Sequence, residues 1–184
     1  KPILEKLSIP ATFYISTNLI DKNLMTWIDQ IEFCIDKVDQ EKVYLPWSSS
    51  PFEILSRKTK IKLLKSIREN VKNNPAKYST KKIVKYIFKQ CKRQMKRSSK
   101  GPLDKKMNWD QVQNLHNHKL FSIGGHSHNH VSLGSLKPDE MQIEIDKSLF
   151  YLKHKANIIT CHYSYPEGQQ VDYNDDVKNI LKNN

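Results

Sequence analysis

The chain has 184 residues, about the length of one domain, and 38% of them are hydrophobic, which is enough for a core. No segment approaches the ~20 uninterrupted apolar residues that a membrane-spanning helix needs, and apolar runs along the whole length argue against global disorder. Cys34, Cys91 and Cys161 are odd in number and far apart, which argues against both a disulfide framework and a cysteine zinc site.

The formal net charge of +12 is concentrated in one segment. Residues 57–106 hold 19 of the 31 Lys and Arg residues but 2 of the 19 acidic residues, so this segment carries +17 and the rest of the chain −5. The segment is typical either of two solvated amphipathic helices docked on a core or of a surface that contacts anionic lipid headgroups or a phosphate-bearing substrate. No nucleic acid is expected as a partner, because no known binding motif accompanies the charge.

The N-terminal part of the sequence predicts alternating helices and strands. Residues 1–8 resemble the end of a helix, and residues 11–16 predict a buried strand rich in aromatic and β-branched side chains. A helix is expected over residues 24–38. Residues 43–46 predict a short edge strand that its proline ends.

Two helices are expected inside the basic segment. The first carries an apolar stripe and ends at Asn73-Asn74-Pro75. The stripe consists of Ile61, Leu64, Ile67 and Val71. The second begins with Ser79 as N-cap and buries a wider face. That face consists of Ile83, Val84, Ile87, Phe88 and Cys91.

After the basic segment, helices and strands alternate again. Asn108 is expected to cap a helix with Gln111 as its capping-box partner, and residues 120–125 predict a strand. A helix follows from Pro138, then a strand over 158–163 and a last helix over 174–182. This alternation indicates a parallel α/β layer or barrel, in which functional residues gather at the carboxyl ends of the strands.

Three histidines directly follow the strand at residues 120–125. His126, His128 and His130 lie within five residues, after two glycines. Imidazole nitrogen is a good ligand for zinc and similar divalent ions, and a catalytic site typically uses three protein ligands and leaves one position for water. From spacing alone the alternative is a surface loop, or a histidine that hydrogen-bonds to a backbone carbonyl. The position after a buried strand favours a metal site.

Four segments, in order, resemble the polysaccharide deacetylase family, the NodB-like (carbohydrate esterase family 4-like) group of metal-dependent sugar deacetylases. Residues 2–14 are similar to the helix and strand after its first motif, and Asn108–Gln111 to the helix before its second. His126–His130 matches the metal motif His-[Ser/Thr]-x-x-His, and Tyr163–Gly168 resembles the third motif. The resemblance covers residues 1 to about 20 and 107–184.

The resemblance implies an α/β fold: a distorted, partial (β/α) barrel with an α-helical insertion. On this basis residues 1–56 are the N-terminal part of the barrel, beginning after the first catalytic motif. Residues 57–106 are the basic helical insertion, and residues 107–184 continue the barrel with the metal-binding and oxyanion motifs.

The resemblance also implies a metal site. His126 and His130 are the expected metal ligands, whereas His128 occupies a variable position, and Ser127 is expected to hold the loop by hydrogen bonding. The expected cofactor is a divalent metal, zinc first, with cobalt, nickel or manganese as alternatives. The metal would lower the pKa of a water molecule, which then attacks an acetamide carbonyl.

The third motif implies the remaining site residues. Glu167 is expected to donate its backbone N–H to the oxyanion, and Tyr165 and Pro166 to contact substrate. Ser164 stands where many members of the family have an Arg that orients the catalytic carboxylate. Trp47 lies between a proline and a run of serines, and among the tryptophans it is the candidate for stacking on a sugar ring.

Two parts of the family's machinery have no counterpart in this sequence. An Asp-Asp pair, which supplies the general base and the third ligand, is expected upstream of Lys1, and a general-acid His beyond Asn184. We therefore expect an excerpt of a deacetylase of N-acetylated cell-envelope sugars or glycolipids, inactive by itself. The alternative is a catalytically inactive relative that binds carbohydrate or anionic lipid. Residues 57–106 are expected to contact an anionic membrane peripherally, and localisation stays open between cytoplasm and cell envelope.

Overall fold

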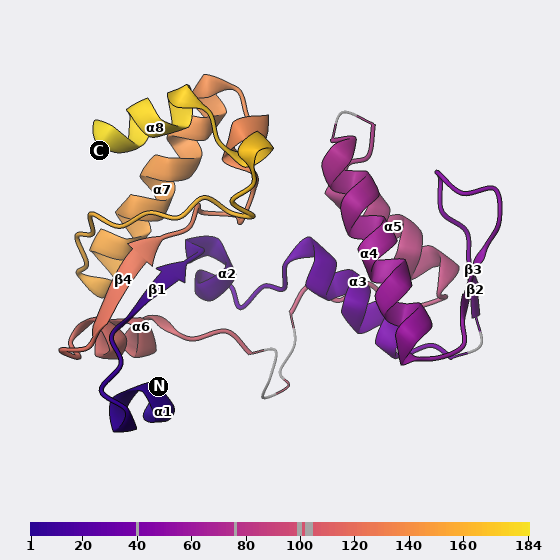
Figure 1. Ribbon diagram of the computed structural model, residues 1–184, viewed down its shortest axis with the longest axis horizontal. Coiled ribbons are helices and arrows are strands. Elements are labelled where there is room, and N and C mark those ends of the chain that lie inside the picture. The colour runs from indigo at the N-terminus through magenta and orange to yellow at the C-terminus, as the bar shows by residue number, and fades with distance from the viewer. Residues whose placement is uncertain (40, 76, 99–100, 102–104) are drawn as a thin grey trace. The chain divides into compact units, whose positions relative to one another are not determined.

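The computed structural model describes residues 1–39, 41–75, 77–98, 101 and 105–184, and these group into two compact units. One unit combines Lys1–Leu24 with Lys100–Asn184, and the other is Met25–Ser99 (Figure 1). Residues 25–56, which we assigned by sequence to the first part of the barrel, group with the basic helices. Six residues of the basic segment (76, 99–100 and 102–104) lie outside the described residues.

The first unit contains two parallel strands. β1 (Ala11–Ile15) and β4 (Phe121–Gly125) pair from Ala11 opposite Phe121 to Ile15 opposite Gly125, and they lie side by side in Figure 1. The helical elements of this unit are α1 (Pro2–Lys6), α2 (Thr17–Asp21), α6 (Trp109–His116), η1 (Leu133–Ser135), α7 (Pro138–Ala156), η2 (Gln170–Asp172) and α8 (Asp175–Lys182). The strands at 11–16 and 120–125 are confirmed to within one residue.

Apolar side chains from both strands join those of α6 and α7 in one cluster. Its buried members are Ile15, Val112, Leu115, Phe121, Ile123, Leu152, Ala156 and Ile158. The N-terminal half of α7 meets α8 and η1 in a second cluster. Its buried members are Leu133, Met141, Ile145 and Val177. Each fully buried aliphatic side chain contributes about 1.5–3 kcal/mol, so α7 holds together the strand pair and the segments that follow it.

The predicted strand over residues 158–163 is wrong. Only one parallel bridge, between Gly125 and Tyr163, links this segment to β4, and the side chain of Ile159 is 83% exposed. The hydroxyl of Thr160 donates to the carbonyl oxygen of Ile123 at 2.6 Å, which takes an acceptor that a strand ladder would use. The described residues therefore form a partial α/β layer, and no closed barrel is seen among them.

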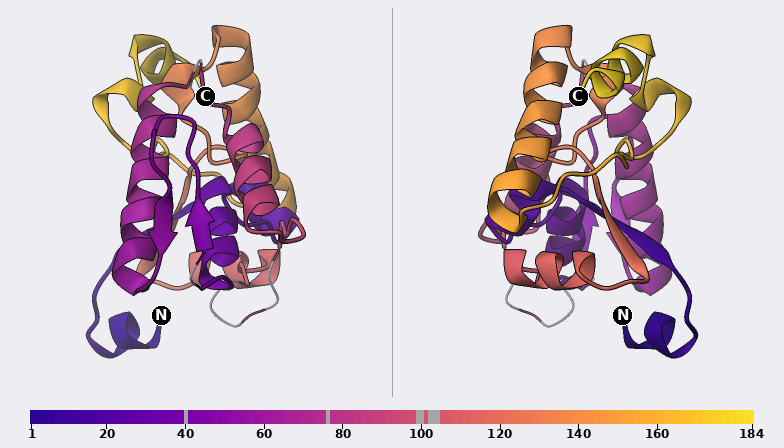
Figure 2. Two further views of the ribbon diagram at one scale, coloured as in Figure 1. Left: turned by 90° about the vertical axis from the view of Figure 1, so that its right-hand side faces the viewer. Right: turned by 90° about the vertical axis from the view of Figure 1, so that its left-hand side faces the viewer.

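The second unit consists of three helices and a hairpin. Its elements are α3 (Trp27–Asp36), β2 (Glu41–Val43), β3 (Phe52–Ile54), α4 (Arg57–Asn73) and α5 (Thr80–Gln90). β2 and β3 pair antiparallel, and Figure 2 (left) shows them in front of α4 and α5. The expected edge strand at 43–46 lies instead at Glu41–Val43, and β3 was not predicted.

The buried face of α4 differs from the predicted stripe. Ile61 is 56% exposed, whereas Leu63, Ile67 and Val71 are buried. The capping box of Ser56 fixes where the helix begins, and the contacts of α4 with α3 and β3 then select the face that includes Leu63.

Trp47 is part of the core of this unit. It packs edge-on against Tyr78, and its indole N–H donates to the hydroxyl of Ser66 at 3.2 Å. This packing argues against a role in sugar stacking. In the described part of the chain, no helix combines the length and apolar character that crossing a membrane requires.

Candidate functional site

The histidine loop begins where β1 and β4 end. The backbone N–H of His126 donates to the carbonyl oxygen of Ile15 at 3.1 Å, and the hydroxyl of Ser16 donates to the carbonyl oxygen of His126 at 2.7 Å. The strand pair therefore continues by one hydrogen bond into the loop. These bonds fix the backbone of His126 against the first turn of α2.

His126 and His130 converge within this loop. Their ring centroids lie 5.0 Å apart, with the rings at 70° to each other. Ser127 and His130 have φ angles of 55° and 56°, in the left-handed region that non-glycine residues seldom occupy, and these turns bring the ends of the loop together. The structure therefore brings together the two histidines that the resemblance implies as metal ligands.

A carbonyl oxygen orients the ring of His126. Nδ1 of His126 lies 2.8 Å from the carbonyl oxygen of Ser164. A carbonyl can only accept, so Nδ1 carries a proton, and in the neutral form of the ring Nε2 keeps its lone pair. A histidine that ligates a metal commonly donates its other N–H in this way, so the hydrogen bond suits metal binding through Nε2.

Ser127 is a fully buried residue of the histidine loop. Its backbone N–H donates to the hydroxyl of Tyr163 at 3.0 Å, and its own hydroxyl accepts from the backbone N–H of Val131 at 3.2 Å. These two bonds tie both ends of the loop together. They suit the expected role of Ser127 in holding the loop.

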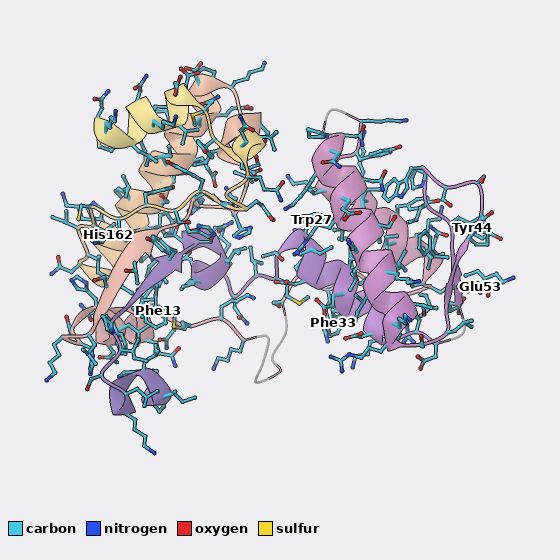
Figure 3. All side chains as sticks on the ribbon, in the orientation of Figure 1. Phe13, Trp27, Phe33, Tyr44, Glu53 and His162 are labelled. Carbon is cyan, nitrogen blue, oxygen red and sulfur yellow. The ribbon has the colours of Figure 1, made fainter. Side chains whose placement is uncertain are left out.

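Tyr163 supports the loop from below. Its hydroxyl also pairs with the hydroxyl of Ser148 on α7 at 2.9 Å, and burial raises the pKa of Tyr163 to about 12. The ring lies so close to Gly125 that a Cβ on that glycine would come within 2.5 Å of it. The residue before Tyr163 in the chain is His162 (labelled in Figure 3). Its carbonyl oxygen accepts a hydrogen bond from the backbone N–H of Gly125 at 2.9 Å.

His128 belongs to the packing of the first unit. It is 8% exposed, its Nδ1 lies 2.8 Å from the hydroxyl of Thr17, and its ring centroid lies 4.8 Å from that of Tyr151. Burial lowers the pKa of His128 below its ordinary value, so the imidazole is neutral at pH 7. These contacts give the ring a structural role between α2 and α7.

Glu144 is a structural residue of the site that sequence reasoning missed. It lies on α7, is 7% exposed, and accepts hydrogen bonds from the backbone N–H and from Nδ2 of Asn129. Asn18 in turn donates to Oδ1 of Asn129 at 2.7 Å. A buried carboxylate with two donors holds the middle of the loop, and the helical pattern alone gives no signal for it.

The third-motif residues lie in the turn after Ser164. The ring of Tyr165 stacks on that of Tyr173 with centroids 4.7 Å apart, and Pro166 is buried. Glu167 and Gly168 both have a φ of 69°, so the backbone turns sharply there, and the side chain of Glu167 is exposed. The oxyanion role of Glu167 and the substrate contacts of Tyr165 and Pro166 stay predictions.

The convergence of His126 and His130 does not extend to a full ligand set. Among the residues that the structure describes, no three His, Cys, Asp or Glu side chains are grouped so that they could hold a metal ion. The pair therefore places two imidazole rings together, and a metal at this position would need further ligands from elsewhere.

A family model described as polysaccharide deacetylase matches residues 1–184. No curated protein matches. Among solved structures, the chain is similar to the Streptococcus pyogenes deacetylase PplD in complex with acetate, with 18% sequence identity and a TM-score of 0.39. That match covers 95% of this chain and 79% of the streptococcal one.

Proposed function

The chain belongs to the polysaccharide deacetylase family, and on this premise we propose that it removes the acetyl group of an N-acetylated sugar in a cell-envelope polysaccharide or glycolipid. Family membership supports a hydrolase of the sugar deacetylase type. The N-acetyl group, the cell-envelope substrate and the metal are part of the proposal.

The metal would be held by His126 and His130. The observation that carries this proposal is the 5.0 Å separation of the two rings, together with the hydrogen bond that orients His126 through its Nδ1–H. Imidazole nitrogens suit zinc, and cobalt, nickel or manganese would accept the same donors. A divalent ion at these nitrogens would supply Lewis acidity that activates water and polarises an acetamide carbonyl. We propose that the family's Asp pair completes the ligand set and provides the general base.

The residues of this chain would orient and stabilise rather than transfer protons. Ser164 holds the ring of His126 through its carbonyl oxygen, and Ser127 fixes the turn between the two histidines. The backbone N–H of Glu167 would donate to the oxyanion, a role that does not depend on its side chain. Tyr165, held by its stacking on Tyr173, and Pro166 would form a wall for the acetyl group.

The basic segment would bring the enzyme to its substrate. The side chains of Arg57, Lys58, Lys62, Lys65 and Arg68 on α4 are exposed. A basic residue near an anionic lipid surface contributes about 1 kcal/mol, so a cluster of this size would favour peripheral contact. Sedimentation with vesicles that contain phosphatidylserine tests this: deletion of residues 57–106 should abolish it, and unchanged sedimentation would contradict the proposal.

The deacetylase proposal is tested by acetate release from N-acetylglucosamine oligomers by the full gene product. We expect release that a chelator stops, that the double variant His126→Ala, His130→Ala lacks, and that His116→Ala, at an exposed position on α6, retains. Binding of the oligomer without any release of acetate would favour the inactive carbohydrate-binding relative. Release that persists in the double variant would contradict the assigned site.

A further inference from the structure

Cys34 and Cys91 lie together in the core of the Met25–Ser99 unit, although they are 57 positions apart in the sequence. Cys34 lies in α3 near its C-terminus, and Cys91 is the C-cap of α5. The two helices pack against each other, the side chains are 1% and 4% exposed, and each thiol shifts the pKa of the other. The pair is therefore formed by the fold rather than by sequence spacing.

The surroundings of the two thiols differ. Cys91 lines a cavity of about 400 Å³ that opens to solvent beside exposed residues of both charges. The other lining residues are Lys37, Val38, Asp39, Glu41, Lys92 and Arg93. Cys34 does not line the cavity and is buried in the apolar cluster of the unit. A small solute can therefore approach Cys91 first.

Electrostatics favour the same order of reaction. The neighbouring thiol of Cys34 lowers the pKa of Cys91, and the Arg93 cation acts in the same direction, whereas burial and Glu41 oppose them. The thiol of Cys91, together with burial, raises the pKa of Cys34. Because the thiolate is the reactive form of cysteine, these directions agree with the access to Cys91 that the cavity provides.

We propose that Cys34 and Cys91 form a peroxide-reactive modification site, in which Cys91 is oxidised first and Cys34 then closes a disulfide. The Cys91 thiolate attacks one oxygen of hydrogen peroxide, the O–O bond breaks, and hydroxide leaves, which yields a sulfenic acid. The sulfur of Cys34 attacks the sulfenyl sulfur, the S–S bond forms, and the oxygen leaves as water with the proton of Cys34. Overall, two thiols reduce one peroxide and yield one disulfide and two waters.

The product would link the end of α3 to the end of α5 within one unit. This proposal does not depend on the proposed deacetylase function, because both cysteines lie outside the unit that carries the histidine loop. Cys161 is exposed and serves as an internal comparison for a thiol without a buried partner.

The test is peroxide treatment of the reduced 184-residue protein, followed by blocking of free thiols, digestion without reductant and mass spectrometry. We expect the Cys34 peptide linked to the Cys91 peptide as the dominant disulfide, with Cys161 free or in intermolecular dimers. Denatured protein should instead give mixed linkages among all three cysteines. Cys34 and Cys91 recovered as free thiols under conditions that oxidise Cys161 would overturn the proposal.

Two variants test the order of the steps. In Cys34→Ser, a dimedone probe for sulfenic acid should accumulate on Cys91, and in Cys91→Ser, Cys34 should stay reduced. Dimedone labelling of Cys34 in the Cys91→Ser variant at the rate of the parent would contradict the assignment of Cys91 as the nucleophile. The wild-type linkage is decisive by itself if either variant fails to fold.

Discussion

Replacing Tyr163 with Phe removes one oxygen atom from beneath the histidine loop and leaves the ring that packs against Gly125. That oxygen accepts from the backbone N–H of Ser127 and pairs with Ser148. Ser148 keeps its bond to the carbonyl oxygen of Ile145, so the variant leaves one buried donor, the Ser127 N–H, without this partner. Such a loss costs about 1–3 kcal/mol, and we expect the free energy of unfolding to fall by that amount at pH 7.

The effect has a defined pH dependence. The folded-state pKa of Tyr163 is about 12, above the ordinary value of 10, so the hydroxyl must stay protonated in the fold. The protonated hydroxyl makes its full contribution to the free energy of unfolding below pH 10. This contribution is lost as the pH rises toward 12, by roughly 1.4 kcal/mol per pH unit. The stability difference between wild type and Tyr163→Phe should therefore shrink across this range.

The assay is urea unfolding of both proteins at pH 7, 9, 10 and 11, with hydrogen exchange of the Ser127 amide at pH 7 as a local measurement. Tyr86→Phe, at an exposed position in the other unit, is the matched control and should match wild type. If the free energy of unfolding of Tyr163→Phe lies within about 0.5 kcal/mol of wild type at pH 7 and the Ser127 amide is equally protected, the Tyr163 hydroxyl does not stabilise the loop.

Two other features can be tested by substitution: the hydrogen bonds of Glu144 with Asn129 in the histidine loop, and the packing of α4. Glu144→Ala removes the acceptor of two hydrogen bonds from Asn129, so we expect a loss of about 2–3 kcal/mol in the free energy of unfolding and faster exchange of the Asn129 amide; an unchanged exchange rate would contradict this role of Glu144. Leu63→Ala should lower the free energy of unfolding by about 2–5 kcal/mol because it leaves a cavity in the core, whereas Ile61→Ala on the exposed face should be nearly neutral. Thermal unfolding that ranks the two variants the other way would show that the buried face of α4 is misassigned.

Local signals predicted the helices well. The capping box of Asn108 and Gln111 forms as expected, and the buried face of α5 includes every residue assigned to it from spacing, from Ile83 to Cys91. These features depend on residues within a few positions of each other. Helical periodicity and capping geometry are therefore enough to find them.

Features that depend on distant contacts were not predictable in the same way. Ile61 and Leu63 both fit a helical stripe with Ile67 and Val71, and only the packing of α3 and β3 decides between them. The apolar, β-branched run that begins at Ile158 reads as a strand, but the side chain of Thr160 bonds to the backbone and leaves a single bridge at Tyr163.

The candidate site shows the same division. The role of His126 and His130 as metal ligands stays a prediction from the sequence. The convergence of their rings depends on the positive φ angles of Ser127 and His130, which the sequence pattern does not predict. Glu144 carries no signal in its own sequence context, because a charged residue on a helix is usually exposed. Cys34 and Cys91 are far apart in the sequence and meet only because α3 packs on α5.

Zinc binding by the purified 184-residue chain shows whether His126 and His130 together hold a divalent metal. Calorimetric titration should show that wild type and His116→Ala bind zinc with the same affinity, and that His126→Ala, His130→Ala binds it much more weakly. Two protein ligands predict modest affinity, which falls at acidic pH because protons compete with the metal for the histidine nitrogens. Zinc binding by the double variant that equals that of wild type would show that the two histidines do not hold the metal.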